Sequence, residues 1–326
     1  MIFFYFLNAK IQPTPLPIVS GHYIIFSICL DKIYNLYKKV LNLVFFATKL
    51  PFAPKFKTKF LIGPTASQLP LDLCGGSVMQ LKQEKFWLAG NSSTEDKFTW
   101  WVPITYHLLA SDQTGFYWLN DTFGSIPLLD QPVDEPFVLN LNQEGYFRVN
   151  YPEKNWDALT SMLLTNATSL SSLTRAQLLD DSLNLARAGR LPYSVSLDLT
   201  RYLEHELDLV PWNSVLNYGL AYLDVRLQSS GSDYALLQNH LRNLLEEVYG
   251  TAESEDLVGE KLRYLVTSWS CYLENSDCLD TARNLWDSWK QSSLWEYEVA
   301  PEDKGWAYCN GIRQVVQSAV CTVYDV

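Results

Sequence analysis

The chain has 326 residues, of which 48% are hydrophobic and 19% charged, and its formal net charge is -11. This composition is typical of a globular protein with an ample buried core, and it excludes disorder over most of the chain. No nucleic-acid partner is expected, because binding a polyanion needs clustered Lys and Arg.

The first 55 residues differ in charge from the rest. Residues 1–70 contain eight lysines and a single acid, Asp31. The apolar run over residues 18–30, about 13 residues, is shorter than the ~20 needed to cross a bilayer as a helix. Residues 1–7 have no basic region before them, as a signal peptide would. We therefore expect residues 1–55 to be a Lys-rich apolar segment outside the fold, with an unusual targeting segment as the alternative.

Residues 56–151 are predicted to form β structure. Aromatic and β-branched runs occupy residues 86–88, 98–109, 115–119, 137–141 and 146–151, separated by turn-forming clusters at 91–93, 111–113 and 142–145. Short strands at this spacing favour a small antiparallel β-sandwich. Residues 98–102 are predicted to be the strand best suited to its core.

From residue 152 to 326 the hydrophobic period becomes helical. Apolar residues recur at steps of three and four, which places each set on one helical face: Ala176, Leu179, Leu183 and Ala186; Leu237, Leu241, Leu244 and Val248; Leu262, Val266, Trp269 and Leu273. Thr174 is predicted to cap one helix and Gly189 to end it. About seven such helices with short connections favour an all-α helical-repeat, α-solenoid-like domain.

A zinc protease site is not expected in this chain. Such a site needs two histidines one helical turn apart with a Glu after the first, so that both rings face one ion. Among the four histidines only His205 is followed by Glu, and position 209 is Leu. His205 is instead expected on the polar face of a helix over residues 192–207.

Paired carboxylates are expected to be structural. Asp180 and Asp181 are adjacent, so on a helix they point about 100° apart. Glu204 and Glu206 are expected to be polar-face residues. No nucleophile signature and no phosphate-binding glycine loop occur. We therefore predict no catalytic and no metal-binding residue.

Two features indicate an extracellular or cell-surface setting. Cys271 and Cys278 flank a short turn between two predicted helices, which can bring their Cα atoms within bridging distance, so a disulfide is favoured if the protein is secreted. Three glycosylation sequons begin at Asn91, Asn120 and Asn166. The sequons can be used only on a chain that enters the secretory pathway.

The segment 137–156 contains an Arg148-Val149-Asn150-Tyr151 element and Trp156. It resembles the junction between β-sandwich and helical domain in the M1 family of zinc aminopeptidases, of the aminopeptidase N type. Residues 175–189, 202–206 and 210–212 match the helices that follow. Cys271 and Cys278 fall where the family has its first helical-domain disulfide. The resemblance covers about residues 56–316.

The resemblance implies a peptide-cleaving family whose zinc is bound in a catalytic domain that precedes this region. Neither HExxH nor the Gly–x–Met–Glu–Asn motif occurs here. We therefore expect a C-terminal fragment of a zinc metallo-aminopeptidase that is inactive alone. Peptides would be bound through the catalytic domain, and a membrane tether could belong to the full-length protein.

Two other interpretations remain open. The chain could be a noncatalytic module that binds peptides or a protein on a concave helical surface. It could also be a subunit that supplies a helical cap to a separately encoded catalytic chain.

Overall fold

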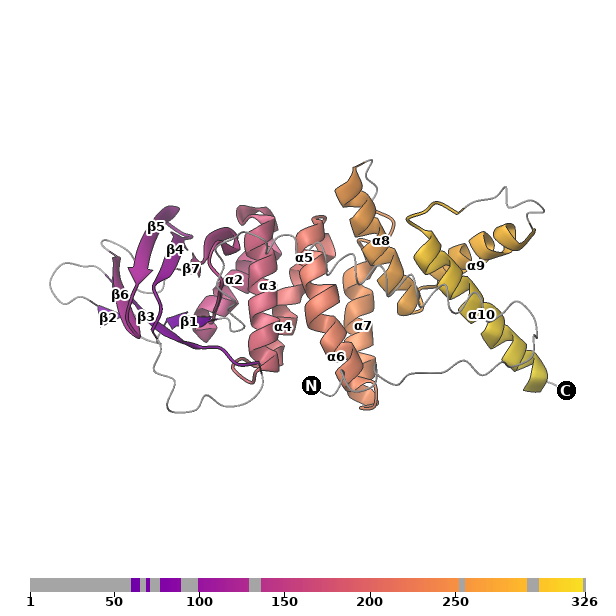
Figure 1. Ribbon diagram of the computed structural model, residues 1–326, viewed down its shortest axis with the longest axis horizontal. Coiled ribbons are helices and arrows are strands. Elements are labelled where there is room, and N and C mark those ends of the chain that lie inside the picture. Colours follow the sequence, from indigo (N-terminus) through magenta and orange to yellow (C-terminus); the bar gives the residue numbers. More distant parts are fainter. Residues whose placement is uncertain are drawn as a thin grey trace, which may run out of the picture. The chain divides into compact units, whose positions relative to one another are not determined.

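The structure is a computed structural model that describes residues 60–64, 69–70, 77–88, 99–128, 136–251, 256–291 and 299–324. All of these residues belong to the unit that begins at Pro54. Residues 1–55 lie outside the described residues, so the expectation for that segment stays a prediction. Figure 1 gives the order of the elements along the chain.

The first described part of this unit consists of two small sheets. One sheet has the order β2-β3-β1-β8, with β6 also paired to β3; its strands are β1 (Phe60–Pro64), β2 (Leu69–Pro70), β3 (Ser77–Lys85), β6 (Phe123–Leu128) and β8 (Phe147–Val149). The other has the order β5-β4-β7, from β4 (Val102–Leu108), β5 (Gln113–Leu119) and β7 (Phe137–Leu139). The predicted β-sandwich is confirmed. All pairings are antiparallel except β1 with β8, which is parallel.

The core strand of the second sheet begins later than predicted. Val102, Ile104 and Leu108 are buried on the inner face of β4, whereas Trp101 is 71% exposed. Successive side chains of a strand point to opposite faces, so burial of Val102 turns Trp101 outward. The prediction that residues 98–102 form the best core strand is therefore wrong for residues 99–101, whereas Val102 begins β4 and is buried, and residue 98 lies outside the described residues.

Helices follow from Glu153 onward, as predicted for this region. The described part of the chain contains α2 (Glu153–Asn166), α3 (Ser172–Arg187), α4 (Tyr193–Thr200), α5 (Leu209–Ser214), α6 (Leu220–Leu227), α7 (Ser232–Glu246), α8 (Leu257–Tyr272), α9 (Ser276–Gln291) and α10 (Lys304–Tyr324). A π-helical turn, Val215–Gly219, joins α5 to α6. The helix expected over residues 192–207 is α4 followed by a 3₁₀ turn, Arg201–His205. None of these helices is both long and apolar enough to cross a membrane.

The cap of α3 differs from the prediction. Ser171, and not Thr174, is the N-cap, since its hydroxyl accepts a hydrogen bond from the Thr174 backbone N–H. The Thr174 hydroxyl lies inside the first turn and accepts from the backbone N–H of Asn142. Gly189 does end this helix, with a φ of 69° that suits glycine.

One hydrophobic core connects the sheets with the helices up to α8. It includes inner-face residues of both sheets and the three predicted helical stripes, except that Ala176 and Ala186, though buried, lie outside the connected cluster and Trp269 is only partly buried. A second cluster surrounds Cys271 and Cys278 and includes Trp306 of α10. Because the first core is continuous, the sandwich and the helices that follow it share most of their stabilising burial.

Candidate functional site

The only His–Glu pair of the sequence does not form a metal site. His205 is exposed, while Glu206 is 4% exposed and turned toward the protein interior. Arg175 of α3 binds Glu206 with two hydrogen bonds, from Nε to Oε2 at 2.6 Å and from Nη2 to Oε1 at 2.9 Å. The expectation that Glu206 is a polar-face residue is therefore wrong: an ion pair with a buried arginine compensates its burial.

The adjacent acids of α3 meet at one cation. Arg148 of β8 contacts Asp180 at 2.6 Å and Asp181 at 2.8 Å, both through Nη1. The second oxygen of Asp181 accepts the backbone N–H of Val149 at 2.9 Å. Burial disfavours the charged guanidinium, but the two carboxylates outweigh it and raise the pKa of Arg148. The acids are structural, as expected, although both point at the same group.

These two ion pairs hold strand β8 and the turn before α5 against α3. The neighbouring segment is joined by buried amides as well. Asn155 of α2 exchanges two hydrogen bonds with the backbone of Phe137, and Gln177 donates to the Leu139 carbonyl. The residues that the sequence singled out at 137–156 and 175–189 thus form a joint between sandwich and helices.

No group of three or more His, Cys, Asp or Glu that could hold a metal ion occurs in the part of the chain that the structure describes. Zinc therefore does not fit these residues. The carboxylates that do gather, at Arg148 and at Arg175, already have cationic partners.

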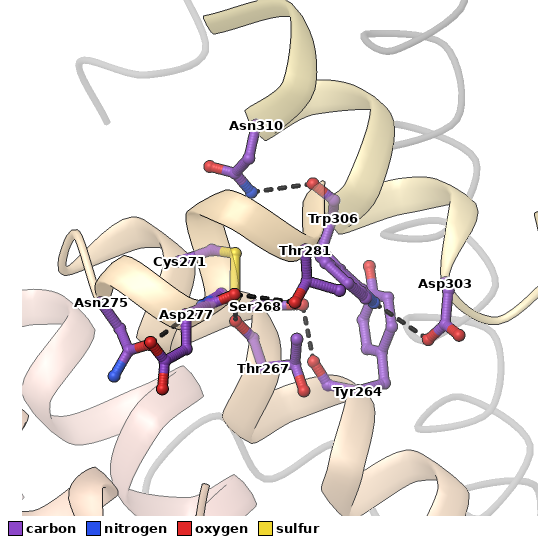
Figure 2. Close-up of a disulfide and its surroundings, with 11 residues drawn as sticks. Tyr264, Thr267, Ser268, Cys271, Asn275, Asp277, Thr281, Asp303, Trp306 and Asn310 are labelled. Atoms are coloured by element: carbon purple, nitrogen blue, oxygen red, sulfur yellow. Dashed lines mark hydrogen bonds between the residues drawn. A yellow bond between two sulfur atoms is a disulfide. The ribbon is translucent and has the colours of Figure 1, made fainter. Parts of the chain in front are cut away.

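Cys271 and Cys278 are joined by a disulfide, with a Cα–Cα distance of 5.2 Å. Figure 2 shows the bond between the end of α8 and the first turn of α9, next to α10. Asn275, in the turn between the helices, accepts the Cys278 N–H at 3.0 Å, and Cys278 Sγ lies 3.3 Å from the Thr267 carbonyl. Trp306 of α10 donates to Asp303 at 3.0 Å and packs in the same cluster. The bond therefore closes the α8–α9 hairpin on which α10 packs.

The three sequons lie in different places. Asn91 is outside the described residues. Asn120 is exposed and comes directly after β5. Asn166 is exposed at the end of α2, and its Oδ1 accepts the Thr168 hydroxyl at 2.7 Å. Both described asparagines are therefore accessible at the surface of the folded chain.

Sequence reasoning missed an exposed group of aromatic side chains on the outer face of the second sheet, here called the aromatic face: Trp101, Phe116 and Trp118, which are 71%, 54% and 50% exposed. Their rings pack edge to face. The ring centroids are 6.2 Å apart for Trp101 with Trp118 and 5.4 Å apart for Phe116 with Trp118. The period-2 alternation of β5, Phe116–Tyr117–Trp118–Leu119, contains the signal, but both faces of the strand are aromatic or apolar. Hydrophobicity alone therefore could not tell the outer face from the inner one.

Comparisons with known proteins show which family the chain is similar to. Residues 136–322 match the model of the ERAP1-like C-terminal domain. The aminopeptidase N of Plutella xylostella is 33% identical over 236 residues, which are 68% of this chain and 24% of that protein. Aminopeptidase Ey of Gallus gallus is 31% identical over 71% of this chain and 25% of its own length, and human aminopeptidase N is 28% identical over 72% and 25%. The chain thus spans about a quarter of the length of the curated relatives it matches.

Proposed function

The chain belongs to the family of the ERAP1-like C-terminal domain, as the C-terminal region of an M1 aminopeptidase of the aminopeptidase N type, and we propose that it contributes structure, not catalysis, to the removal of N-terminal residues from peptides. In this proposal the zinc and the residues that act on the peptide belong to the catalytic domain that aminopeptidases of this family have, and not to the sandwich or the helices. The sandwich and helices described here form part of the wall that encloses the peptide. The protein works outside the cell or at its surface.

One observation carries the noncatalytic part of the proposal. The only sequence that begins like a zinc motif, His205-Glu206, has Leu at position 209, and Glu206 is fully engaged by Arg175 and by the Asp208 backbone N–H at 2.9 Å. A carboxylate in that arrangement cannot reach a metal-bound water on the solvent side. The disulfide and the exposed sequons support the extracellular setting.

The joint supports the structural role. A wall around a substrate must keep its shape, and rigid positioning of catalytic parts depends on packed supporting residues. The buried Arg148 and a continuous core fix the helices to the sandwich, and the buried Arg175 fixes the turn before α5 to α3 within the helical part. Movement of the sandwich against the helices would leave buried charges without their partners.

The noncatalytic role is tested with the purified full chain, added zinc and a chromogenic aminoacyl substrate. We expect no release above the protein-free rate, and the same rate for His205→Ala. Hydrolysis that a chelator abolishes and that His205→Ala removes would overturn the proposal.

The wall is tested by addition in trans. A related aminopeptidase N that lacks its own C-terminal region is mixed with this chain, and cleavage of short peptides is followed. We expect the chain to bind and raise the rate. A folded chain that neither binds nor changes the rate refutes the role in the peptide chamber.

A further inference from the structure

We propose that the aromatic face is the packing surface of an N-linked glycan on Asn120, whose first sugar lies against the rings of Trp118 and Trp101. The inference rests on the extracellular setting of the proposed function. It goes beyond a glycosylation sequon, because it assigns the glycan a fixed position and the exposed rings an occupant.

The aromatic face is a continuous surface on neighbouring strands. Phe116 and Trp118 are two residues apart on β5, so their side chains stand on the same face. The antiparallel register pairs Pro103 with Trp118 and Val102 with Leu119, which brings Trp101 diagonally next to Trp118 (Figure 1 labels both strands). An exposed apolar patch of this kind on a soluble domain generally has something to bind.

Asn120 lies at the edge of this surface. It directly follows Leu119, the last residue of β5, and it is exposed, as Trp118 is, whereas Leu119 between them is fully buried. The pairing of β4 with β5 ends at Val102 and Leu119, and Trp101 and Asn120 are the residues that directly flank this last pair. Opposite side chains of an antiparallel pair have Cβ atoms about 4.5–5.5 Å apart, so a sugar attached to Asn120, one position beyond such a pair, is within reach of Trp101.

A buried glutamine holds the two sides of the site together. Gln83 is 3% exposed, and its Nε2 donates to the carbonyls of Trp100 at 3.0 Å and Asp121 at 2.8 Å. Its Oε1 accepts the Trp100 backbone N–H at 2.9 Å. The residue before Trp101 and the residue after Asn120 are thus bound to one side chain, which fixes the spacing between the rings and the sequon.

The chemistry of the surface suits a neutral sugar. Residues 99–108 and 113–120 contain no Asp, Glu, Lys or Arg. A pyranose has one face of C–H groups, whose hydrogens contact the negative face of an aromatic ring, while its hydroxyls remain in water. The edge-to-face rings of Trp101 and Trp118 offer such a ring face next to the asparagine.

The attachment itself follows the ordinary chemistry of the sequon. The donor is a lipid-diphosphate-linked oligosaccharide. The Asn120 amide nitrogen forms a bond to the anomeric carbon, the bond from that carbon to the diphosphate oxygen breaks, and the diphosphate leaves with the electron pair while the amide loses one proton to a base of the transferase. Thr122 completes the sequon.

Asn166 provides a matched control in the same chain. It too is an exposed asparagine of a sequon, but the residue two positions before it is Leu164, and its Oδ1 already accepts the Thr168 hydroxyl. A glycan there would not meet the aromatic face. Any effect common to both sites is a general effect of glycosylation.

In the experiment, the full chain is expressed in eukaryotic cells with an added cleavable signal peptide, which directs it to the secretory pathway whatever its own targeting sequence is. Site occupancy is read by mass spectrometry of glycopeptides, and hydroxyl-radical labelling measures the solvent access of individual rings. We expect Asn120 to be occupied. We expect labelling of Trp101 and Trp118 to be at least about twofold slower than in Asn120→Gln, because a packed sugar covers much of each exposed ring.

Two further samples fix the interpretation. Trimming the folded glycoprotein to its first sugar should keep the protection, and complete enzymatic removal should abolish it without any effect of mutation on folding. Asn166→Gln should leave both labelling rates unchanged. An unoccupied Asn120, equal labelling with and without its glycan, or protection that disappears on trimming would overturn the inference. None of these outcomes affects the zinc-dependent assay, whose failure would concern only the proposed function.

Discussion

Removing Arg175 should destabilise the protein far more than removing an arginine from a surface pair. In Arg175→Met the Glu206 carboxylate, 4% exposed, loses both guanidinium bonds and keeps the Asp208 backbone N–H. The Leu170 carbonyl loses its bond from Arg175 Nη1 as well. Breaking a buried ion pair by removing one partner costs about 3–5 kcal/mol in the free energy of unfolding.

The assay is urea unfolding followed by circular dichroism, with the midpoint compared at an unchanged slope. Arg190→Met is the matched control, because Arg190 pairs with Glu84 while its side chain is 40% exposed. That change should cost at most about 1 kcal/mol. The double variant Arg175→Met with Glu206→Leu should recover most of the loss, because it leaves no buried charge. If Arg175→Met costs no more than Arg190→Met, the ion pair of Arg175 with Glu206 does not stabilise the fold.

Three further predictions concern other elements. Replacing both Cys271 and Cys278 by Ala should cost about 2.5 kcal/mol in urea unfolding, since their separation of 7 residues closes a small loop in the unfolded chain; an unchanged midpoint would contradict it. Burial lowers the pKa of His240 below its ordinary value of 6.5; Arg201 lowers it further, and Glu204 and Asp198 oppose the shift. Because the unfolded chain then binds a proton more readily at this histidine, its contribution to the stability of the fold is present above about pH 6.5 and is lost as the pH falls below it. His240→Gln should therefore lose less stability than the native chain between about pH 7.5 and pH 5.5, and an equal loss would refute the assignment. In Gly311→Ala the new Cβ would lie 2.5 Å from Trp286 Cβ and 3.1 Å from the Ala282 carbonyl oxygen, so the poorer packing of α10 on α9 should lower the free energy of unfolding by about 1–3 kcal/mol in urea unfolding. Gly305→Ala is the control and should cost less, because below 3.4 Å its Cβ would meet only the end of the Tyr264 side chain.

The helical part was predictable because its burial follows a period that the sequence displays directly. Leu237, Leu241 and Leu244 are apolar at steps of four and three, and all three are buried. The caps were less predictable. Ser171 and Thr174 are both good capping residues, and the Thr174 hydroxyl is engaged by the backbone N–H of Asn142, which lies in the turn between β7 and β8 and is distant in sequence.

The polar contacts were not predictable, because each depends on a partner distant in sequence. Glu206 reads as part of a charged, exposed run, and only the position of Arg175, 31 residues earlier, explains its burial. Whether the Trp101 side chain points inward or outward was also not predictable, for a reason that lies in the adjacent residues. Its neighbours Trp100 and Val102 are both apolar, so the pattern lacks the alternation that assigns faces, and the backbone of Trp100 is held by Gln83, 17 residues earlier in the chain.

The buried charges of the joint are consistent with a structural role for this region. A pair such as Arg175 with Glu206 adds little net stability over an apolar pair, because both groups lose their hydration. It does, however, make displacement costly, since any shift that separates the partners leaves a charge in the interior. Arg148 has the same effect between the sheet and α3, because Asp181 of α3 accepts hydrogen bonds both from the Arg148 guanidinium and from the backbone of β8. Replacement of Arg148 by Met should therefore loosen the sandwich against the helices, and faster hydrogen exchange at β8 and α3 would measure this.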